Sequence, residues 1–255
     1  MSTSLKQARD GRLLRLTLGR PEKRNALNVS LCRELVDAFR SADRDREVGA
    51  ILLDAEGPAF SSGMDLDEVL RPDAAGNAAI HEELFTSGAR ISKPIVAAVQ
   101  GAALAGGTGL VANAHIAVAA DDARFGLTEM RLALWPYFVF RAVKAAVGER
   151  RAVELSLTAR MFGAAEALAL GLVHMVAPAA DLPEQAAAIA RRLADASPEA
   201  IGGGLDYVRR SRGMNWEEAG RLAAELRARN FASADFTEGI RAFREKRPPR
   251  WPSLE

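Results

Sequence analysis

The glycine-rich stretch at residues 101–109, with the sequence GAALAGGTG, has the residue types and spacing most suited to chemistry. It follows an apolar run at 94–100 that predicts a buried strand, and it precedes residues 110–113, which can continue as a buried helix. The first N–H groups of a helix have no partner within the helix, and the helix dipole favours negative charge there. Such a turn can bind an anion or an oxyanion that develops during a reaction. Alternatively, the glycines only let the strand and the helix pack closely.

A second loop of small residues, Phe60 to Asp65, follows the strand predicted at 48–54. In an α/β arrangement both loops lie at the carboxyl ends of strands, where ligands usually bind. One backbone N–H from each loop, directed at the same oxygen, would make an oxyanion hole. Neither loop fits Gly-x-Ser-x-Gly, Gly-x-Gly-x-x-Gly or the P-loop pattern, so serine hydrolase and dinucleotide-binding functions have no support.

Glu129 is the candidate acid or base. It stands in a mostly apolar run after a predicted strand, so its carboxyl group can be desolvated and its pKa raised, which suits general acid–base catalysis. Alternatively, Glu129 pairs with Arg131 or Arg124.

The elements that would position these residues alternate between strands and helices over roughly the first 180 residues. Asn28 is a suitable N-cap for the first helix, and residues 71–77 predict a loop. Only helices are predicted beyond this alternating part, which indicates an α/β core with a helical C-terminal appendage. The predicted strands of the core lie at 11–18, 48–54, 94–100 and 115–120, and its helices include 29–42, a short one from 65 and 78–91.

The composition is that of an ordinary globular protein, with 255 residues, 49% of them hydrophobic and 26% charged. The net charge of +1 gives no support for binding to nucleic acid or to a membrane surface. A single cysteine, Cys32, excludes an intrachain disulfide, and three scattered histidines lack metal-ligand spacing. The first residues lack an apolar signal core, and no run of about 18 apolar residues occurs. A cytoplasmic protein is therefore expected.

Six segments, in order over nearly the whole chain, resemble the crotonase superfamily, the enoyl-CoA hydratase/isomerase family. The family fold is a spiral of ββα units with a C-terminal helical region that forms trimers or dimers of trimers. The resemblance therefore implies an α/β fold with a spiral core over 1–195, a helical oligomerisation region over 196–255, and a homotrimer or hexamer. The matching segments are 20–28 (RPEKRNALN), 59–66 (AFSSGMDL), 93–107 (KPIVAAVQGAALAGG), 125–136, 164–173 and 235–247.

The resemblance also implies an enzyme that forms an enolate from an acyl-CoA thioester. Met64 and Gly106 would donate the two oxyanion N–H groups, and Glu129 would transfer protons. No cofactor or metal is implied, because coenzyme A is part of the substrate. The loop at 23–27 would contact the adenine and the phosphates, and other residues would line the pantetheine channel or the acyl end. The residues implied to bind substrate are Lys23, Arg24, Ala26, Leu27, Ser62, Asp65, Leu66, Gly107 and Trp135.

Gly109 departs from the family pattern. Hydratases of the family hold water between two glutamates, of which the second matches Glu129 and the first lies three residues past Gly106, on the same helix face. Here that position is Gly109. A single carboxylate suits double-bond isomerisation, in which one base moves a proton from C2 to C4. Hydration, isomerisation and a non-catalytic acyl-CoA-binding role all stay open, and Gly109→Glu is expected to raise hydratase activity.

Two further residues have alternative interpretations. Arg131 would predict a carboxylated or polar acyl group if it faced the pocket, but it can equally form an outward salt bridge. His81 lies in the segment that lines the acyl pocket in relatives, where it can act as an acid or base or simply lie on an exposed helix face.

Overall fold

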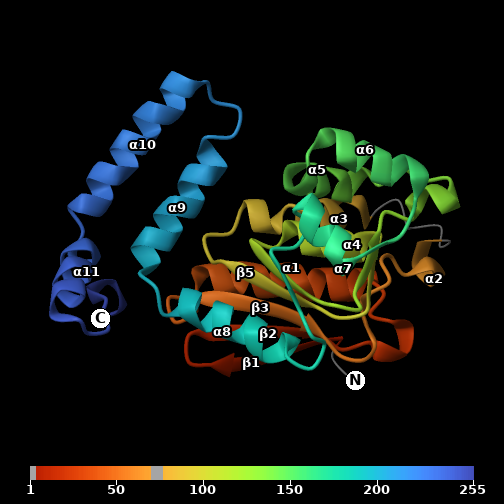
Figure 1. Ribbon diagram of the computed structural model, residues 1–255, viewed down its shortest axis with the longest axis horizontal. Coiled ribbons are helices and arrows are strands. Elements are labelled where there is room, and N and C mark those ends of the chain that lie inside the picture. The colour runs from red at the N-terminus through yellow and green to blue at the C-terminus, as the bar shows by residue number, and fades with distance from the viewer. Residues whose placement is uncertain (1–3, 70–76) are drawn as a thin grey trace.

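The computed structural model describes residues 4–69 and 77–255, so the loop predicted at 71–77 lies outside the described residues except for Asn77. Along the chain, two strands are followed by helical structure, and this order repeats (Figure 1). This order is β1 (Leu5–Asp10), β2 (Leu13–Leu18) and α1 (Val29–Arg44); β3 (Ala50–Ala55), β4 (Ala59–Ser61), α2 (Leu66–Val69) and α3 (Ala78–Leu84); β5 (Ile95–Val99), β6 (Ala102–Leu104) and α4 (Gly106–Asn113); and β7 (Ile116–Ala120), β8 (Arg124–Gly126) and α5 (Tyr137–Val147).

The strands of these units form two sheets. The larger sheet has the order β1-β2-β3-β5-β7-β10, with β10 at Met175–Ala177, and it is parallel beyond the antiparallel β1–β2 hairpin. The smaller sheet has the order β4-β6-β8-β9, with β9 at Phe162–Gly163. From β3 onward, each unit adds its first strand to the larger sheet and its second to the smaller one. The chain is therefore a spiral of ββα units.

The core lies on both faces of the larger sheet. The strands β3 and β5 are buried along nearly their whole length, as their continuous apolar runs predict for parallel strands covered on both sides. The helix α8 (Leu182–Ala194) packs on β3, β5 and β7. Asn28 caps α1 as predicted, because its side chain accepts a hydrogen bond from the N–H of Leu31 at 2.9 Å.

The helix predicted at 78–91 is shorter than expected. It ends at Leu84, and a 3-10 turn follows at Ser87–Ala89. The hydroxyl groups of Thr86 and Ser87 donate hydrogen bonds to carbonyl groups one turn back, which competes with helix continuation. Gly88 then lies so close to the carbonyl of Asn113 that an added Cβ would be 1.8 Å from its oxygen.

The last helices form an arm beyond the sheets: α9 (Pro198–Arg210), α10 (Trp216–Phe231) and α11 (Ala234–Glu245). Figure 1 shows α9 and α10 running side by side and away from the core. No residue of α9 is buried, and α10 buries only Leu222 and Leu226. Trp216 and Phe243 expose 90% and 85% of their surface. Between α5 and the arm lie α6 (Glu149–Thr158), α7 (Ala164–Leu170) and α8. None of the helices in the described ranges is long and apolar enough to cross a membrane.

Candidate active site

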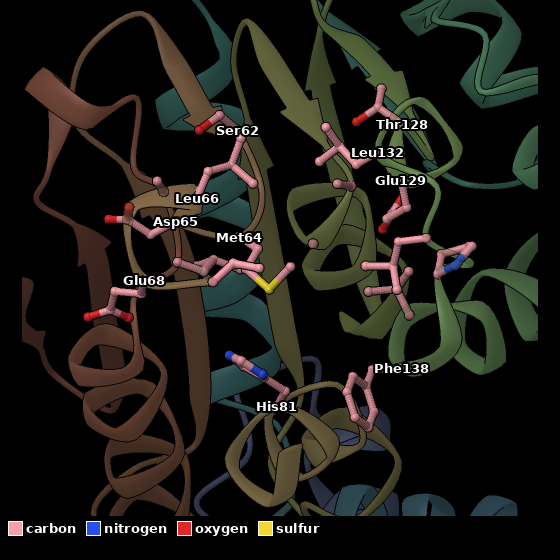
Figure 2. A pocket seen from close by; sticks show the side chains of 18 of the residues that line it. Ser62, Met64, Asp65, Leu66, Glu68, His81, Thr128, Glu129, Leu132 and Phe138 are labelled. Atoms are coloured by element: carbon pink, nitrogen blue, oxygen red, sulfur yellow. The ribbon is translucent and has the colours of Figure 1, made fainter. Parts of the chain in front are cut away.

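A cavity of about 540 Å³ lies where the two glycine-containing loops meet α3, α5 and the 3-10 turn that begins at Glu129. The loop after β4 contributes Ser62 and residues 64–66, and the turn into α4 contributes Ala105 and Gly106. Figure 2 shows Glu129 directed into the cavity from the side opposite Met64. The structure thus brings together the three predicted catalytic residues, which are up to 65 positions apart in the sequence (129 − 64 = 65).

The backbone N–H groups of Met64 and Gly106 have no hydrogen-bond acceptor among the described residues. Leu27 donates its N–H to the carbonyl of Gly63 at 2.8 Å, and its own carbonyl accepts from Asp65 at 3.1 Å. The N–H of Met64, which lies between these two bonds, therefore points away from Leu27. Gly106 is the first residue of α4, so its N–H has no partner within the helix.

The two N–H donors are held close by tight backbone contact. Gly63 has φ of 92°, and a Cβ added there would lie 2.8 Å from Cβ of Ala105 and 3.2 Å from the nitrogen of Gly106. Ala105 itself has φ of 50° and ψ of −116°, an uncommon conformation for a residue with a side chain. Its N–H donates to the carbonyl of Gly126 at 2.7 Å, which helps to fix the turn. Such backbone strain is typical of sites that preorganise donors.

Glu129 is 9% exposed, and its Oε2 atom is buried without a hydrogen-bond partner in the described structure. Burial raises the pKa of Glu129 to about 7, because the charged form loses its water, and a hydrogen bond from its own backbone N–H opposes this shift. The alternative ion pair with Arg131 is not formed: the guanidinium of Arg131 donates to the carbonyl of Ala159 at 2.7 Å, at the end of α6. Among the described residues Arg124 forms no ion pair with Glu129 either, and its Nη1 lies 2.6 Å from where a Cβ of Gly163 would be.

Gly109, one turn along α4, is covered by two apolar side chains that also line the cavity. A Cβ added to Gly109 would lie 2.3 Å from Cγ1 of Val139 and 3.0 Å from Cε1 of Phe85. Real Cβ atoms do not approach other atoms so closely. The expected gain of hydratase activity from Gly109→Glu stays a prediction, and it requires that the new side chain displace the stiff side chain of Val139.

The cavity mouth contains the predicted coenzyme A loop. Most of the residues expected to bind substrate line the cavity, and Gly107 does not: a Cβ there would lie 2.4 Å from the carbonyl oxygen of Ser61, so Gly107 serves close packing against β4. Lys23 forms an exposed ion pair with Asp67 at 2.9 Å. The predicted residues on the lining are Lys23, Arg24, Ala26, Leu27, Ser62, Asp65, Leu66 and Trp135.

Arg20 and Asn25, which the sequence interpretation missed, hold this mouth together. Arg20 forms a largely buried ion pair with Asp65 at 2.9 Å and donates to the carbonyl of Ala26. The side chain of Asn25 is fully buried and donates to the carbonyls of Glu56 and Ala59 at 2.9 and 2.8 Å. Both residues belong to segment 20–28, one of the six segments that carry the family resemblance. This resemblance is the signal that could have identified them. The ion pair thus anchors Asp65, the residue that follows Met64, and Asp65 also lines the cavity.

Comparisons with known proteins find relatives over nearly the whole chain. A family model described as "Enoyl-CoA hydratase/isomerase" matches residues 9–253. A protein of Thermus thermophilus is 36% identical over 251 residues, covering 96% of this chain and 99% of that protein. An enoyl-CoA hydratase of Mycobacterium tuberculosis is 32% identical, covering 95% of this chain and 94% of that one. The crystal structure of an enoyl-CoA hydratase from Mycobacterium smegmatis superposes with a TM-score of 0.92 at 32% identity, covering 98% and 99% of the two chains. The predicted crotonase-like α/β fold is confirmed.

Proposed function

The chain belongs to the enoyl-CoA hydratase/isomerase family, and from this premise we propose that it is an acyl-CoA isomerase with Glu129 as its single acid–base group. The observation that carries the proposal is the isolated carboxyl group of Glu129. It is buried, unpaired at Oε2 and has its pKa raised to about 7, and it shares a cavity with the free N–H groups of Met64 and Gly106.

The proposed reaction moves a double bond from C3 to C2 of an enoyl-CoA. The thioester carbonyl accepts hydrogen bonds from Met64 and Gly106, which stabilise negative charge as it develops on the oxygen. The carboxylate of Glu129 removes a proton from C2, and the electron pair is delocalised as a dienolate. The protonated Glu129 then returns the proton to C4. A pKa near 7 suits both steps, because the group is ionised often enough to act as a base and is still able to donate.

The apolar side chains packed against Gly109 favour isomerisation over hydration. Addition of water needs a positioned water molecule, which the family's hydratases hold between two carboxylates. In this chain the corresponding space is filled by Val139 and Phe85, which offer no hydrogen bond to water. Hydration stays as a second candidate, because the name of the Mycobacterium tuberculosis relative is enoyl-CoA hydratase.

A parallel assay with a 3-enoyl-CoA and a 2-enoyl-CoA of equal chain length tests this proposal. We expect conversion of the 3-enoyl to the 2-enoyl thioester, with hydration roughly 100-fold slower or more, because one positioned acid–base group is missing. Hydration at a comparable rate would overturn the choice of isomerisation. Binding without any turnover would favour the alternative of a non-catalytic acyl-CoA-binding member, and calorimetry that shows no binding of CoA thioesters would exclude both.

The charged residues at the cavity mouth support coenzyme A as the carrier of the acyl group. Lys23 and Arg24 are the charged residues with the sign that suits phosphate, and both line the mouth with Ala26 and Leu27. Arg24 is held with φ of 50°, and its carbonyl accepts from the N–H of Ser62 at 2.9 Å, which links the two loops. We propose that this loop contacts the adenine and the phosphates. The absence of a separate cofactor and the cytoplasmic location remain predictions.

We also propose that the α9–α11 arm joins copies of the chain into a trimer or a hexamer. The support is its exposed apolar surface, which includes Val208 on α9 and Phe243 on α11. Sedimentation of the purified protein is expected to give the mass of three or six chains, and a monomer at micromolar concentration would contradict the proposal.

A further inference from the structure

The three histidines of the chain have different surroundings. His115 and His174 each accept a hydrogen bond at Nδ1 from a backbone N–H, from Ile95 at 3.0 Å and from Ala117 at 3.1 Å. We therefore assign His115 and His174 a structural role beside the strands of the larger sheet. The imidazole of His81 has no hydrogen-bond partner among the described residues, although it is half-buried. A polar side chain left unpaired in a cavity is a candidate for ligand binding.

His81 lies on α3 and lines the cavity. Figure 2 shows its ring directed inward between Met64 and Phe138. The rings of His81 and Phe138 are 6.2 Å apart between centroids, with planes tilted by 50°. Phe85 and Val139 add apolar surface to this end of the cavity, and Glu68 also lines the cavity within electrostatic range of His81. His81 is therefore a polar group set in the part of the cavity that would receive the acyl chain.

The surroundings of His81 favour the neutral form of its imidazole. Burial lowers the pKa of His81, and the carboxylate of Glu68, from α2, opposes this shift only in part. A neutral imidazole has one N–H donor and one nitrogen acceptor. It can thus donate to a carbonyl or exchange hydrogen bonds with a hydroxyl group.

The charges at the same end of the cavity are poorly suited to an acyl chain that carries a carboxylate. Arg131 is turned away to the carbonyl of Ala159, and Arg141 on α5 pairs with Glu82 at 2.9 Å. Among the described residues of the lining, the lysine and arginine side chains are those of Lys23 and Arg24, which lie on the loop proposed to bind coenzyme A. Within this described part of the cavity, the chemistry that remains for the acyl end is an uncharged oxygen.

We propose that His81 is a specificity-determining residue that hydrogen-bonds to an uncharged oxygen, a hydroxyl or a carbonyl, on the acyl chain of the substrate. The preferred substrates are then oxygen-bearing acyl-CoA thioesters and not plain alkyl ones. This inference rests on the proposed function in so far as an acyl-CoA must occupy the cavity. An alkyl chain would strip water from His81 and return no hydrogen bond, and we expect it to bind roughly 10-fold more weakly.

Calorimetry with saturated thioesters tests the proposal without requiring turnover. The probes are hexanoyl-CoA and its 4-oxo, 5-oxo and 6-hydroxy counterparts, which place one oxygen at successive depths and avoid the 4- and 5-hydroxy compounds, because these form lactones and lose coenzyme A. We expect at least one counterpart to bind about 10-fold more tightly than hexanoyl-CoA. His81→Leu is expected to abolish this preference and to bind hexanoyl-CoA more tightly than the unaltered protein does. An unfolded variant cannot produce that gain. His81→Gln, which keeps a donor and an acceptor, is expected to retain part of the preference.

Two results would overturn the inference while leaving the proposed function intact. In the first, the unaltered protein binds all the probes within about twofold of one another. In the second, His81→Leu keeps the preference for an oxygenated probe. Failure of every probe to bind would instead overturn the proposed function, and this inference with it.

Discussion

Two walls of one cavity are built from different parts of the chain. The backbone wall (residues 63–64 and 105–106) offers N–H groups, whereas the side-chain wall (Glu129, Val139 and Phe85) offers one carboxyl group and apolar surface. The backbone wall depends on turn geometry, which several sequences can adopt. The side-chain wall depends on residue identity at each position. A family with this fold can therefore keep enolate stabilisation while it changes the reaction that follows.

The walls also differ in how they tolerate a small change. Around Gly63 the backbone wall has no free space, since an added Cβ would lie 2.9 Å from the carbonyl oxygen of Leu104. On the side-chain wall, an apolar side chain has taken the space that a second acid–base group would need. The first wall is expected to lose activity when its donors are displaced. In the second wall, loss of the Glu129 carboxyl group should remove activity, whereas a change of its apolar side chains should mainly affect packing and the choice of reaction.

The largest effect is expected from Glu129→Gln, which removes the only acid–base group of the side-chain wall. We expect kcat to fall by about 10⁴-fold, because the carboxylates of Asp65 and Glu68 lie on the opposite side of the cavity from Glu129 (Figure 2) and cannot take over its proton transfer. Steady-state kinetics with a 3-enoyl-CoA measure this change, and calorimetry should show thioester binding retained. Glu47→Gln is the matched control, since Glu47 is an exposed glutamate outside the cavity. An unchanged rate in Glu129→Gln would remove this residue from the mechanism.

Gly63→Ala tests the backbone wall and is expected to have the next largest effect. Alanine is strained at φ of 92° and would press on Ala105, so the N–H of Met64 should move relative to that of Gly106. Loss of one oxyanion donor typically lowers kcat by about 10²–10³-fold.

Gly213→Ala separates backbone strain from displacement of the donors. Gly213 has φ of 80°, and an added Cβ meets no atom within 4 Å. This control should keep the full kcat. If Gly63→Ala also kept it, the backbone wall would not be the oxyanion site.

The sequence predicted the backbone wall well, because each of its halves is a short local motif. Met64 follows a glycine in a small-residue loop, and Gly106 opens a helix after a buried strand. The partnership of Arg20 with Asp65, across 45 positions, has no such pattern. It depends on how the first two ββα units pack, and neither residue type is diagnostic alone.

The side-chain wall was predicted in part. Glu129 was recognisable from its apolar surroundings, and Gly109 from what it lacks. That Val139 fills the space beside Gly109 follows from the packing of α5 on α4, which no local pattern specifies. His81 was expected on an exposed helix face, but α3 turns it into the cavity. The strand β6 was missed because its three residues are too few to show a period.

The pH dependence of stability is expected to distinguish the carboxyl group of Glu129, which titrates, from the apolar side chains of the same wall, which do not. Its pKa is about 7 in the folded protein and near 4.5 in the unfolded chain, so the folded state holds the proton more tightly. The unaltered protein should therefore lose stability as pH rises through this interval, by about 3 kcal/mol in total. Glu129→Gln lacks this titration, and its stability relative to the unaltered protein should increase from pH 5 to pH 8.

Urea unfolding at both pH values, at one protein concentration, measures this difference. Over the same range, kcat/KM of the unaltered protein should rise with an apparent pKa near 7, because the free enzyme must hold Glu129 as the carboxylate. A stability difference that stays constant with pH would show that Glu129 is not desolvated in the folded protein.

The smallest effect is expected at the contact between Gly109 and Val139, where a double-mutant cycle can show whether the side-chain wall is tightly packed. Gly109→Ala improves helix propensity by roughly 1 kcal/mol, but the added methyl group would lie 2.3 Å from Cγ1 of Val139. We expect the clash to dominate, with a net loss of about 1–3 kcal/mol in the free energy of unfolding. In the Val139→Ala background this loss should shrink, so that the two substitutions are less costly together than their sum. Gly220→Ala in α10, where an added Cβ meets no atom within 4 Å, should instead stabilise the protein. Additive losses would mean that Val139 does not occupy the space beside Gly109, and the proposed preference for isomerisation over hydration would then lose its support.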